Sequence, residues 1–482
     1  MNKLLIALLA LSLSGCVSLP TLRKTSPDLP AVWPPTSPLP LGEGAGVREQ
    51  RLQAWWTQFN DPALTLLIDE ALARNSDLLL AAARIEEARS TLGLREADRH
   101  PEAHIGGNAG RTRATEKGSF PIPSPINNKF QVNLQAAYEV DLWGRYRQAS
   151  AAARADLLAS EYAREVVRAG LAGAVAQAYF QITTLDAALL LTRDTLNNRR
   201  EAVDLYKLRF DAGIASELPL RQAEAELATV EAAQAELQRQ LRQQETALAL
   251  LLGRSPRALT ENPLARGKPL RELTLPPTIP AGLPADLLAR RPDIRQAEQR
   301  LVGAEARVLE TRAAIYPSLS LTANLGSESK ALSNLFSGPA TLWGIGASLV
   351  QTVYNAGRTE AALKGEAARQ EQALLAYEQA LRVAFKEVLD ALVANRQARE
   401  SEAAESRRAE ALSRAAELAG LRYQNGVSSY LEVLDAQRNL YQAEQNRIEA
   451  RRVQLAATAG LFRALGGGWH PRPETSLPAG RE

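Results

Sequence analysis

The sequence predicts a mainly α-helical fold that carries a small membrane β-sheet and consists of two copies of one unit. Very long segments without proline predict the helices, and short stretches of alternating apolar and polar residues predict the strands. The duplication is visible in three landmark residues that recur 213 positions later (358 − 145): Arg145, Gly213 and Gly253 return as Arg358, Gly426 and Gly466. This period is longer than the roughly 20–50 residues of solenoid repeats and indicates a duplicated domain.

The N-terminus has the layout of a secretory signal. Lys3 precedes an apolar run over 4–13, which is shorter than the ~20 residues that span a bilayer as a helix. Leu13–Cys16 resembles a bacterial lipobox, in which the cysteine is acylated after cleavage. We therefore expect a covalent lipid such as palmitate on Cys16, and Val17 after it favours the outer membrane. The alternative is an ordinary signal with an incidental cysteine.

Proline-rich stretches divide the rest of the chain. Such stretches have no repeating apolar face, so we expect an extended tether after Cys16 and a linker between the halves. The expected division is a signal peptide over 1–15, an N-terminal segment over 16–60, a first repeat over 61–254, a linker over 255–283, a second repeat over 284–466 and a C-terminal tail over 467–482.

Composition excludes several classes of function. A net charge of +3 over 482 residues lacks the basic footprint of a nucleic-acid-binding protein. His100, His104, His470 and the single cysteine form no spacing typical of a metal site or a Cys–His pair. No glycine-rich phosphate loop is present. We expect no enzyme activity and no cofactor besides the lipid on Cys16.

Each half is expected to contain a helix, two strands, a very long helix and a further helix. The clearest strands lie over 130–138 and 318–325, and two glycine-rich ones lie around 104–113 and 342–353. Strict alternation gives a strand one apolar and one polar face, and a length of roughly ten residues suits a tilted membrane strand. The alternative is a soluble sheet on a core. The residues expected to face lipid are Phe130, Val132, Leu134, Leu319, Leu321 and Leu325, and those expected to face water are Gln131, Asn133, Ser320 and Asn324.

The long helices are predicted over 145–210 and 358–423. About 66 residues at 1.5 Å per residue extend about 100 Å, which no compact domain of this size accommodates. Both segments are rich in alanine, which permits close coiled-coil packing. Because four strands per chain leave open edges in lipid, and the smallest closed barrels have eight, the chain must oligomerise. Two copies would supply eight strands and three would supply twelve.

Three segments carry a family resemblance: Trp55–Leu64, Gly282–Ile294 and Val433–Arg438. They resemble signature segments of the outer-membrane efflux lipoproteins of the TolC-like superfamily, of the NodT type, over essentially the whole mature chain. The resemblance implies a homotrimer with a twelve-stranded barrel in the outer membrane and a helical barrel through the periplasm. It implies an exit duct for small molecules, with a periplasmic adaptor and an inner-membrane transporter as partners, and no chemistry of its own.

The resemblance also implies a gate where the long helix turns into the next one. Glu432 and Asp435 lie three residues apart, so a trimer would gather six carboxylates around one axis. Arg422 and Tyr423 are expected to hold the closed state. The alternative is that both acids are ordinary charges of a helix N-terminus. In the first half Pro219 stands where the family often has an acid, with Glu217 as the candidate substitute for the locking contact.

Two other functions fit parts of the pattern. The outer-membrane component of a type I protein secretion system would have the same architecture. A lipid-anchored structural tether without a pore would need the long helices and no lipid-facing sheet, so the alternating strands disfavour it.

Overall fold

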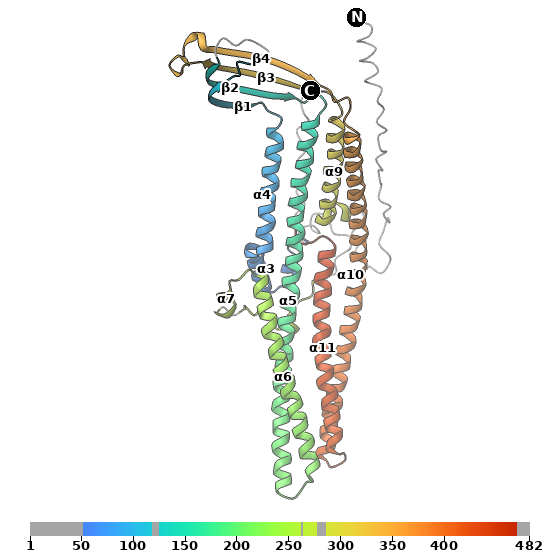
Figure 1. The fold of residues 1–482 in the computed structure, drawn as a ribbon. Helices are drawn as coiled ribbons and strands as arrows, with labels where there is room; N and C mark the ends of the chain where they lie inside the picture. Colours follow the sequence, from blue (N-terminus) through green and yellow to red (C-terminus); the bar gives the residue numbers. More distant parts are fainter. Residues whose placement is uncertain (1–51, 118–124, 262–263, 277–285, 470–482) are drawn as a thin grey trace. The chain divides into compact units, whose positions relative to one another are not determined.

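The computed structural model describes residues 52–117, 125–261, 264–276 and 286–469. These residues form two compact units (Figure 1). The sheet unit contains Arg84–Glu161 and Gln296–Glu378, and the hairpin unit contains the other described residues. Each unit takes segments from both halves of the duplicated sequence.

Two helical hairpins repeat each other in length and spacing. The long helices have 67 residues each and their partners 35 each, and the second pair starts 213 positions after the first (358 − 145). The helices are α5 (Arg145–Asp211), α6 (Glu217–Leu251), α10 (Arg358–Gln424) and α11 (Tyr430–Ala464). The duplication predicted from the sequence is therefore confirmed in the fold.

Both hairpin turns depend on a glycine. Gly213 and Gly426 have φ angles of 71° and 73°, a left-handed conformation that only glycine adopts without strain. In each turn the next residue donates its backbone N–H to a carbonyl five positions back: Ile214 to Arg209, and Val427 to Arg422, both at 2.9 Å. The two tips are thus closed by the same backbone geometry.

The root of the first hairpin is anchored by an asparagine. Its helix α6 ends at Leu251, whose carbonyl accepts a hydrogen bond of 2.9 Å from the Asn75 side chain. Gly253 follows, where an added Cβ would lie 2.3 Å from the Arg74 carbonyl oxygen. A larger residue would push this helix end away from its anchor.

The root of the second hairpin lies at the equivalent position, and a different side chain binds its helix end. Arg291 donates to the Ala464 carbonyl at 3.0 Å, and Ala464 is the counterpart of Leu251. Arg291 also pairs with Asp293 and Glu387, each at 2.6 Å. An added Cβ on Gly466 would lie 2.7 Å from the Arg290 carbonyl oxygen. An amide therefore binds the last carbonyl of α6 and a buried guanidinium binds that of α11, and an ion pair lies at each root, since Arg254 pairs with Glu70 at 2.9 Å at the first.

The helix expected before each strand pair is divided in two. Asn75 is extended (ψ 131°), and its side chain accepts the Asp77 N–H at 2.9 Å, so it ends one helix and caps the next. Arg291 separates the corresponding pair in the second half. The four helices are α3 (Pro62–Arg74), α4 (Ser76–Ala97), α8 (Asp286–Arg290) and α9 (Pro292–Ala313).

The core of the hairpin unit is aromatic. Trp55 and Phe59, in the 3₁₀ turn η1 (Trp55–Phe59), are completely buried. The Trp55 ring stacks on Phe462 at 5.7 Å between centroids, and Phe59 contacts Phe180 at 5.1 Å. Residues 52–59, which the sequence division assigned to the N-terminal segment, thus belong to this core, because their large apolar side chains have partners on α5 and α11.

Part of the segment between the repeats packs against the same unit. The buried Asp61 carboxylate accepts hydrogen bonds from the Tyr179 hydroxyl at 2.6 Å and from the Lys268 N–H at 3.2 Å. An added Cβ on Gly267 would lie 2.2 Å from Asp61 Oδ1, so this contact requires glycine. Burial and the carboxylate raise the pKa of Tyr179, which keeps the phenol a donor. The segment also contains α7 (Pro256–Glu261) and η2 (Leu270–Glu272).

The sheet unit carries one antiparallel sheet of four strands among the described residues. Their order is β1-β2-β3-β4, so the central β2–β3 pair joins the two halves and β1 and β4 are edges (Figure 1). The strands are β1 (Glu102–Arg113), β2 (Ile126–Val140), β3 (Ser318–Ser329) and β4 (Thr341–Val350). Short 3₁₀ turns η3 (Leu332–Asn334) and η4 (Gly338–Ala340) connect β3 to β4.

One helix among the described residues meets the length and composition of a membrane span. A window of α5 has a mean hydropathy of 1.2, and 61% of that window is buried inside the protein. The core helix of a soluble protein has the same properties, so this is weak evidence for a span.

Candidate functional site

The strand register gives the sheet one apolar face. Leu134 lies opposite Leu325, which lies opposite Trp343, and Ala136, Ala323 and Ile345 form the next row. All six residues predicted to face lipid lie on this face: Phe130, Val132, Leu134, Leu319, Leu321 and Leu325. Their contact with lipid stays a prediction.

The opposite face is polar. Gln131, Asn133, Ser320 and Asn324 lie there, as the alternation predicts. An added Cβ on Gly344 would lie 2.7 Å from the Asn324 side-chain oxygen, and one on Gly106 would lie 3.1 Å from that of Asn133. The glycines that made β1 and β4 hard to recognise thus leave room for asparagine side chains on the neighbouring strands.

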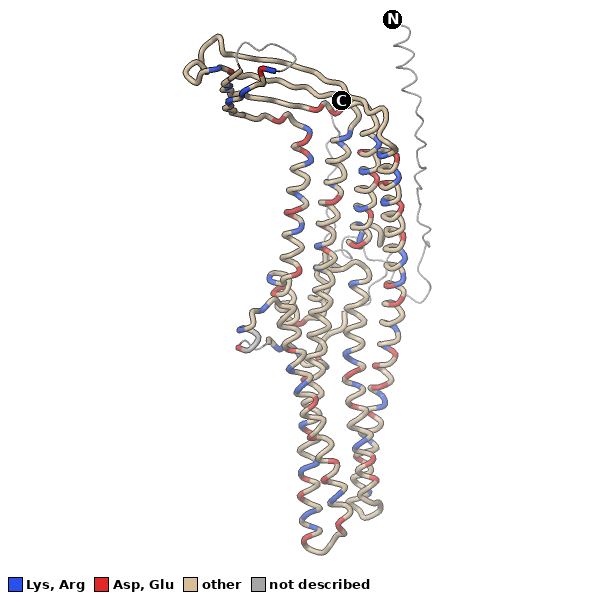
Figure 2. The backbone as a smooth tube through the Cα atoms, viewed as in Figure 1, with Lys and Arg blue, Asp and Glu red and all other residues tan. Residues whose placement is uncertain are grey.

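Sequence reasoning missed the apolar residues of the edge strands. Ile105, Trp343 and Ile345 are 74–83% exposed and share the face of the predicted residues. Alternation of apolar residues with glycine and serine from Trp343 to Leu349 was the available signal. The charged side chains of the strands lie toward the strand ends and leave the middle of the sheet uncharged (Figure 2).

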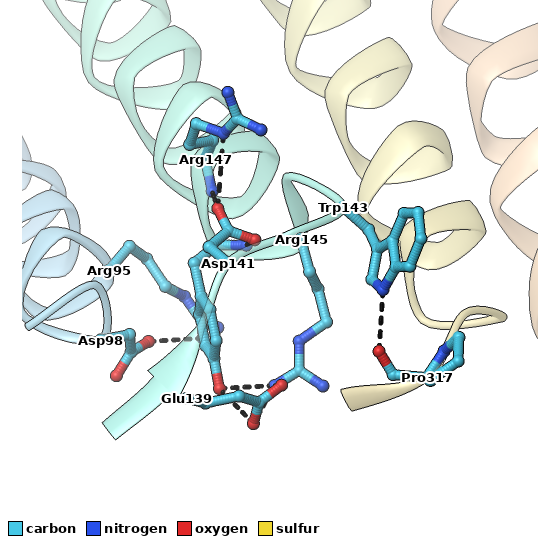
Figure 3. Close-up of polar contacts among 9 residues, drawn as sticks. Arg95, Asp98, Glu139, Asp141, Trp143, Arg145, Arg147 and Pro317 are labelled. Atoms are coloured by element: carbon cyan, nitrogen blue, oxygen red, sulfur yellow. Dashed lines mark hydrogen bonds and ion pairs between the residues drawn. The ribbon is translucent and has the colours of Figure 1, made fainter. Parts of the chain in front are cut away.

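A polar junction fixes the end of β2 to the start of α5. The Asp141 carboxylate accepts the Tyr146 and Arg147 N–H groups at 3.2 and 2.9 Å and so caps α5 (Figure 3). Glu139 accepts the Tyr146 hydroxyl at 2.9 Å and contacts Arg145 at 3.4 Å. Nearby, Arg95 pairs with Asp98 at 3.5 Å.

A tryptophan joins this junction to the turn between α9 and β3 in the second half. The Trp143 indole N–H donates to the Pro317 carbonyl at 2.8 Å (Figure 3), and its ring stacks on Tyr316 at 4.8 Å. Both rings remain about half exposed. An exposed aromatic pair with one hydrogen-bonded polar atom, placed at the end of an apolar sheet, is typical of a membrane–water interface.

At the tip of the second hairpin, each candidate gate carboxylate has its own arginine. Arg422 pairs with Glu432 across the turn at 3.1 Å, and Asp435 contacts Arg438 at 3.4 Å. Arg438 also pairs with Glu226 of α6 at 2.8 Å. Glu432 and Asp435 are about half exposed, so each pair contributes at most ~1 kcal/mol. The predicted acidic ring would therefore carry compensating positive charge in this conformation.

Tyr423 lies in a tyrosine cluster between the two hairpins. Its hydroxyl is 2.7 Å from the Tyr206 hydroxyl and accepts a hydrogen bond of 2.7 Å from Arg209 of α5. The Tyr206 and Tyr430 rings lie 4.2 Å apart, and Leu220 of α6 packs against the cluster. Burial raises the pKa values of Tyr206 and Tyr430, so both phenols stay protonated at physiological pH.

The cluster is one of several polar contacts between α5 and the second hairpin. Three of the buried residues of α5, Thr192, Arg199 and Tyr206, are spaced seven apart and each makes such a contact. Thr192 contacts the Tyr441 hydroxyl at 2.9 Å and Arg199 donates to Gln437 at 2.5 Å. We call these three contacts the polar ladder. Sequence reasoning missed it, although the heptad spacing of polar residues on α5 was a usable signal.

The hydrogen-bonding groups around the polar ladder are only partly paired. Within the described part of the chain, the Nε atom of Arg199 and the hydroxyl of Tyr430 are buried and have no hydrogen-bond partner. Burial lowers the pKa of Arg199. An unpaired buried polar group costs roughly 1–3 kcal/mol. The polar ladder therefore fixes the register between the two hairpins, and its unpaired groups lower the stability of their contact.

The candidate locking acid of the first hairpin tip contacts its own helix. Pro219 occupies the first turn of α6, and the described contacts of Glu217 run to Arg221 of the same helix at 2.9 Å. Glu217 thus forms no recorded link to the second hairpin. Cys16 lies outside the described residues. Among those residues, no group of three or more His, Cys, Asp or Glu side chains could hold a metal ion.

Comparison with known proteins gives concordant results. The family model described as outer membrane efflux protein matches residues 67–254 and 283–467. The solvent efflux pump outer membrane protein SrpC of Pseudomonas putida is 36% identical over 464 residues, which cover 95% of this chain and 97% of the relative. The probable outer membrane lipoprotein SilC of Salmonella typhimurium is 32% identical over 464 residues, which cover 95% and 96%.

A solved structure agrees over the whole fold. The crystal structure of the Campylobacter jejuni CmeC outer membrane channel matches with a TM-score of 0.88 at 25% sequence identity. The match covers 96% of this chain and 97% of that channel.

Proposed function

Because this chain belongs to the outer membrane efflux protein family, we propose that it forms the outer-membrane exit duct of a tripartite efflux system. The observation that supports this best is the two-faced sheet, whose apolar face suits lipid and whose polar face suits a water-filled lumen. The resemblance to named efflux pump components extends over nearly the full chain.

The sheet implies an oligomer, and the family favours a trimer. Four strands with two open edges would leave backbone groups unsatisfied in lipid, so β1 of one copy must pair with β4 of another. Three copies give a barrel of twelve strands. A periplasmic adaptor and an inner-membrane transporter are the proposed partners, and the transporter supplies the energy.

The duct has no chemical step to perform. Efflux channels are passive, and we propose neither catalysis nor a cofactor besides the lipid on Cys16. The polar sheet face conducts the cargo through the membrane, and the helix tips close the periplasmic entrance. Arg422, Tyr423 and the polar ladder would hold the tips together until a partner separates them.

Conductance measures the proposed function directly. The purified protein, added to a planar bilayer, should give discrete channels from an assembly whose mass equals three chains. A protein that binds the bilayer and never conducts would indicate the lipid-anchored tether instead. Co-purification with the adaptor of a type I secretion system, and with no efflux adaptor, would indicate protein secretion.

Cys16→Ala should abolish lipid labelling of the mature protein and slow its delivery to the outer membrane. The barrel should still insert, because the apolar sheet face supplies its own affinity for lipid. Metabolic labelling with palmitate, followed by mass spectrometry of the N-terminus, checks this. A free thiol at Cys16 in the wild-type mature protein would refute the anchor.

Tyr423→Phe should raise the open fraction of the channel in the absence of partners. The change removes one hydroxyl that binds both Tyr206 and Arg209, at roughly 1 kcal/mol per lost hydrogen bond in each copy. Single-channel recording measures the open fraction. Tyr354→Phe, at an exposed tyrosine of the sheet unit, is the matched control and should leave it unchanged.

A further inference from the structure

The apolar face of the sheet contains a hollow of about 270 Å³. Ala136 and Ala323 form its floor, because they are the small pair in a row that ends at Ile345. Its walls come from the neighbouring side chains Leu134, Leu325, Trp343 and Ile345. The hollow lies within one chain, between β2, β3 and β4, so its walls need no second copy.

The chemistry of the hollow suits a hydrocarbon chain. The side chains of its floor and walls on this face are apolar, and Trp343 and Ile345 are 74% and 83% exposed. Asn324 and Gly344 also line the hollow, and both are strand positions of the opposite face. Between two apolar phases, affinity comes from van der Waals packing, and a notch offers more contact than a flat surface. A narrow flexible chain fills such a notch better than the protein's own side chains, which project away from the sheet.

The polar junction supplies a place for a headgroup. Ala136 lies four residues before the end of β2, so the hollow is about 14 Å from that end at ~3.4 Å per residue. At the ~40° tilt of strands in a membrane barrel this is about 11 Å along the membrane normal, close to half of the ~25 Å apolar band of such barrels. The half-exposed Trp143 and Tyr316 rings lie just beyond the strand ends, where headgroups meet the hydrocarbon.

We propose that the hollow binds one acyl chain of a membrane phospholipid whose headgroup lies at the Trp143–Tyr316 pair. The proposal rests on the proposed function, since it requires the apolar face to lie in the membrane. It assigns a lipid site to each chain, and it gives the aromatic pair the role of setting its depth.

Native mass spectrometry tests the site. The wild-type assembly and the Ala136→Leu/Ala323→Leu variant are reconstituted in vesicles of phosphatidylethanolamine and phosphatidylglycerol and then released into detergent. The wild type should retain about one phospholipid per chain, and the filled variant should lose it. Ala347→Leu, on the same face but outside the hollow, should retain it. Equal retention by the wild type and the filled variant, or loss in Ala347→Leu, would overturn the proposal.

Two further measurements keep the result interpretable. Trp143→Ala should also lower retention, because the site loses its headgroup end while the hollow is intact. Channel conductance and assembly mass should stay normal in all variants, so unchanged retention with normal conductance refutes the lipid site alone. Absence of conductance in the wild type would instead refute the duct.

The lipid on Cys16 is the remaining candidate occupant of the hollow. Retention of phospholipid by Cys16→Ala should match the wild type, and free lipid that binds only after this change would mean that the protein's own anchor occupies the hollow.

Discussion

Leu321→Arg is expected to destabilise the barrel by about 2–4 kcal/mol if this position lies near the bilayer midplane, and by less toward an interface. Leu321 lies on the apolar face, opposite Tyr138 and Ala347, so a guanidinium there would enter lipid. Equilibrium unfolding of the assembly from lipid vesicles in urea measures the change.

The adjacent residue provides a control on the opposite face. Thr322 lies opposite Ala137 and Gly346, and Gly346 leaves room beside it for a longer side chain. Thr322→Arg should leave stability nearly unchanged and shift the ion selectivity of the conducting lumen. Equal destabilisation at the two positions would contradict the assignment of the faces.

The double change Glu432→Ala/Asp435→Ala is expected to reverse the charge at the closed tip. The wild-type carboxylates are paired with Arg422 and Arg438, so their removal leaves Arg422 without its carboxylate partner and Arg438 paired with Glu226 alone. Block by polyvalent cations from the periplasmic side should weaken, and selectivity should move toward anions. The effect should be largest at low ionic strength, where the Debye length is ~30 Å at 0.01 M.

A matched variant separates the gate from a general charge effect. Glu217→Ala removes an exposed acid from the equivalent turn of the first hairpin, where the acid pairs with Arg221. It should change block and selectivity much less. If the double variant conducts, selects and is blocked like the wild type, Glu432 and Asp435 are ordinary helix-end charges and the constriction lies elsewhere.

The sequence predicted the elements whose signal is local. The long helices end within one residue of their expected bounds, because a glycine turn follows each one. The strict alternation of β2 and β3 predicted the two faces. The alternation left β1 and β4 unclear, because glycines on these strands leave room for the side chains of Asn133 and Asn324 on neighbouring strands.

Features that depend on distant partners left only weak signals in the sequence. Asn75 interrupts a helical pattern because Leu251, far along the chain, offers it a carbonyl to cap. The polar ladder is composed of residues that a helical pattern assigns to the surface, and only the packing of α5 against the second hairpin buries them. The pairing of Arg422 with Glu432 likewise depends on the turn that brings them together, whereas Asp435 and Arg438 are neighbours three residues apart on α11.

Each hairpin is anchored at its root, so a small rotation about the root moves the distant tip by several ångströms. A helix of 35 residues separates root from tip in both hairpins, a distance of about 52 Å at 1.5 Å per residue. A rotation of only ~5° about a root would carry its tip about 4.5 Å at this arm length. A small rotation of the helix at Asn75 or Arg291 thus produces a displacement of the tip that is large enough to break every contact of the tyrosine cluster. Both roots combine a hydrogen bond to a helix-end carbonyl with an ion pair, Arg254 with Glu70 at the first and Arg291 with Asp293 and Glu387 at the second, so salt should weaken the anchoring of both hairpins.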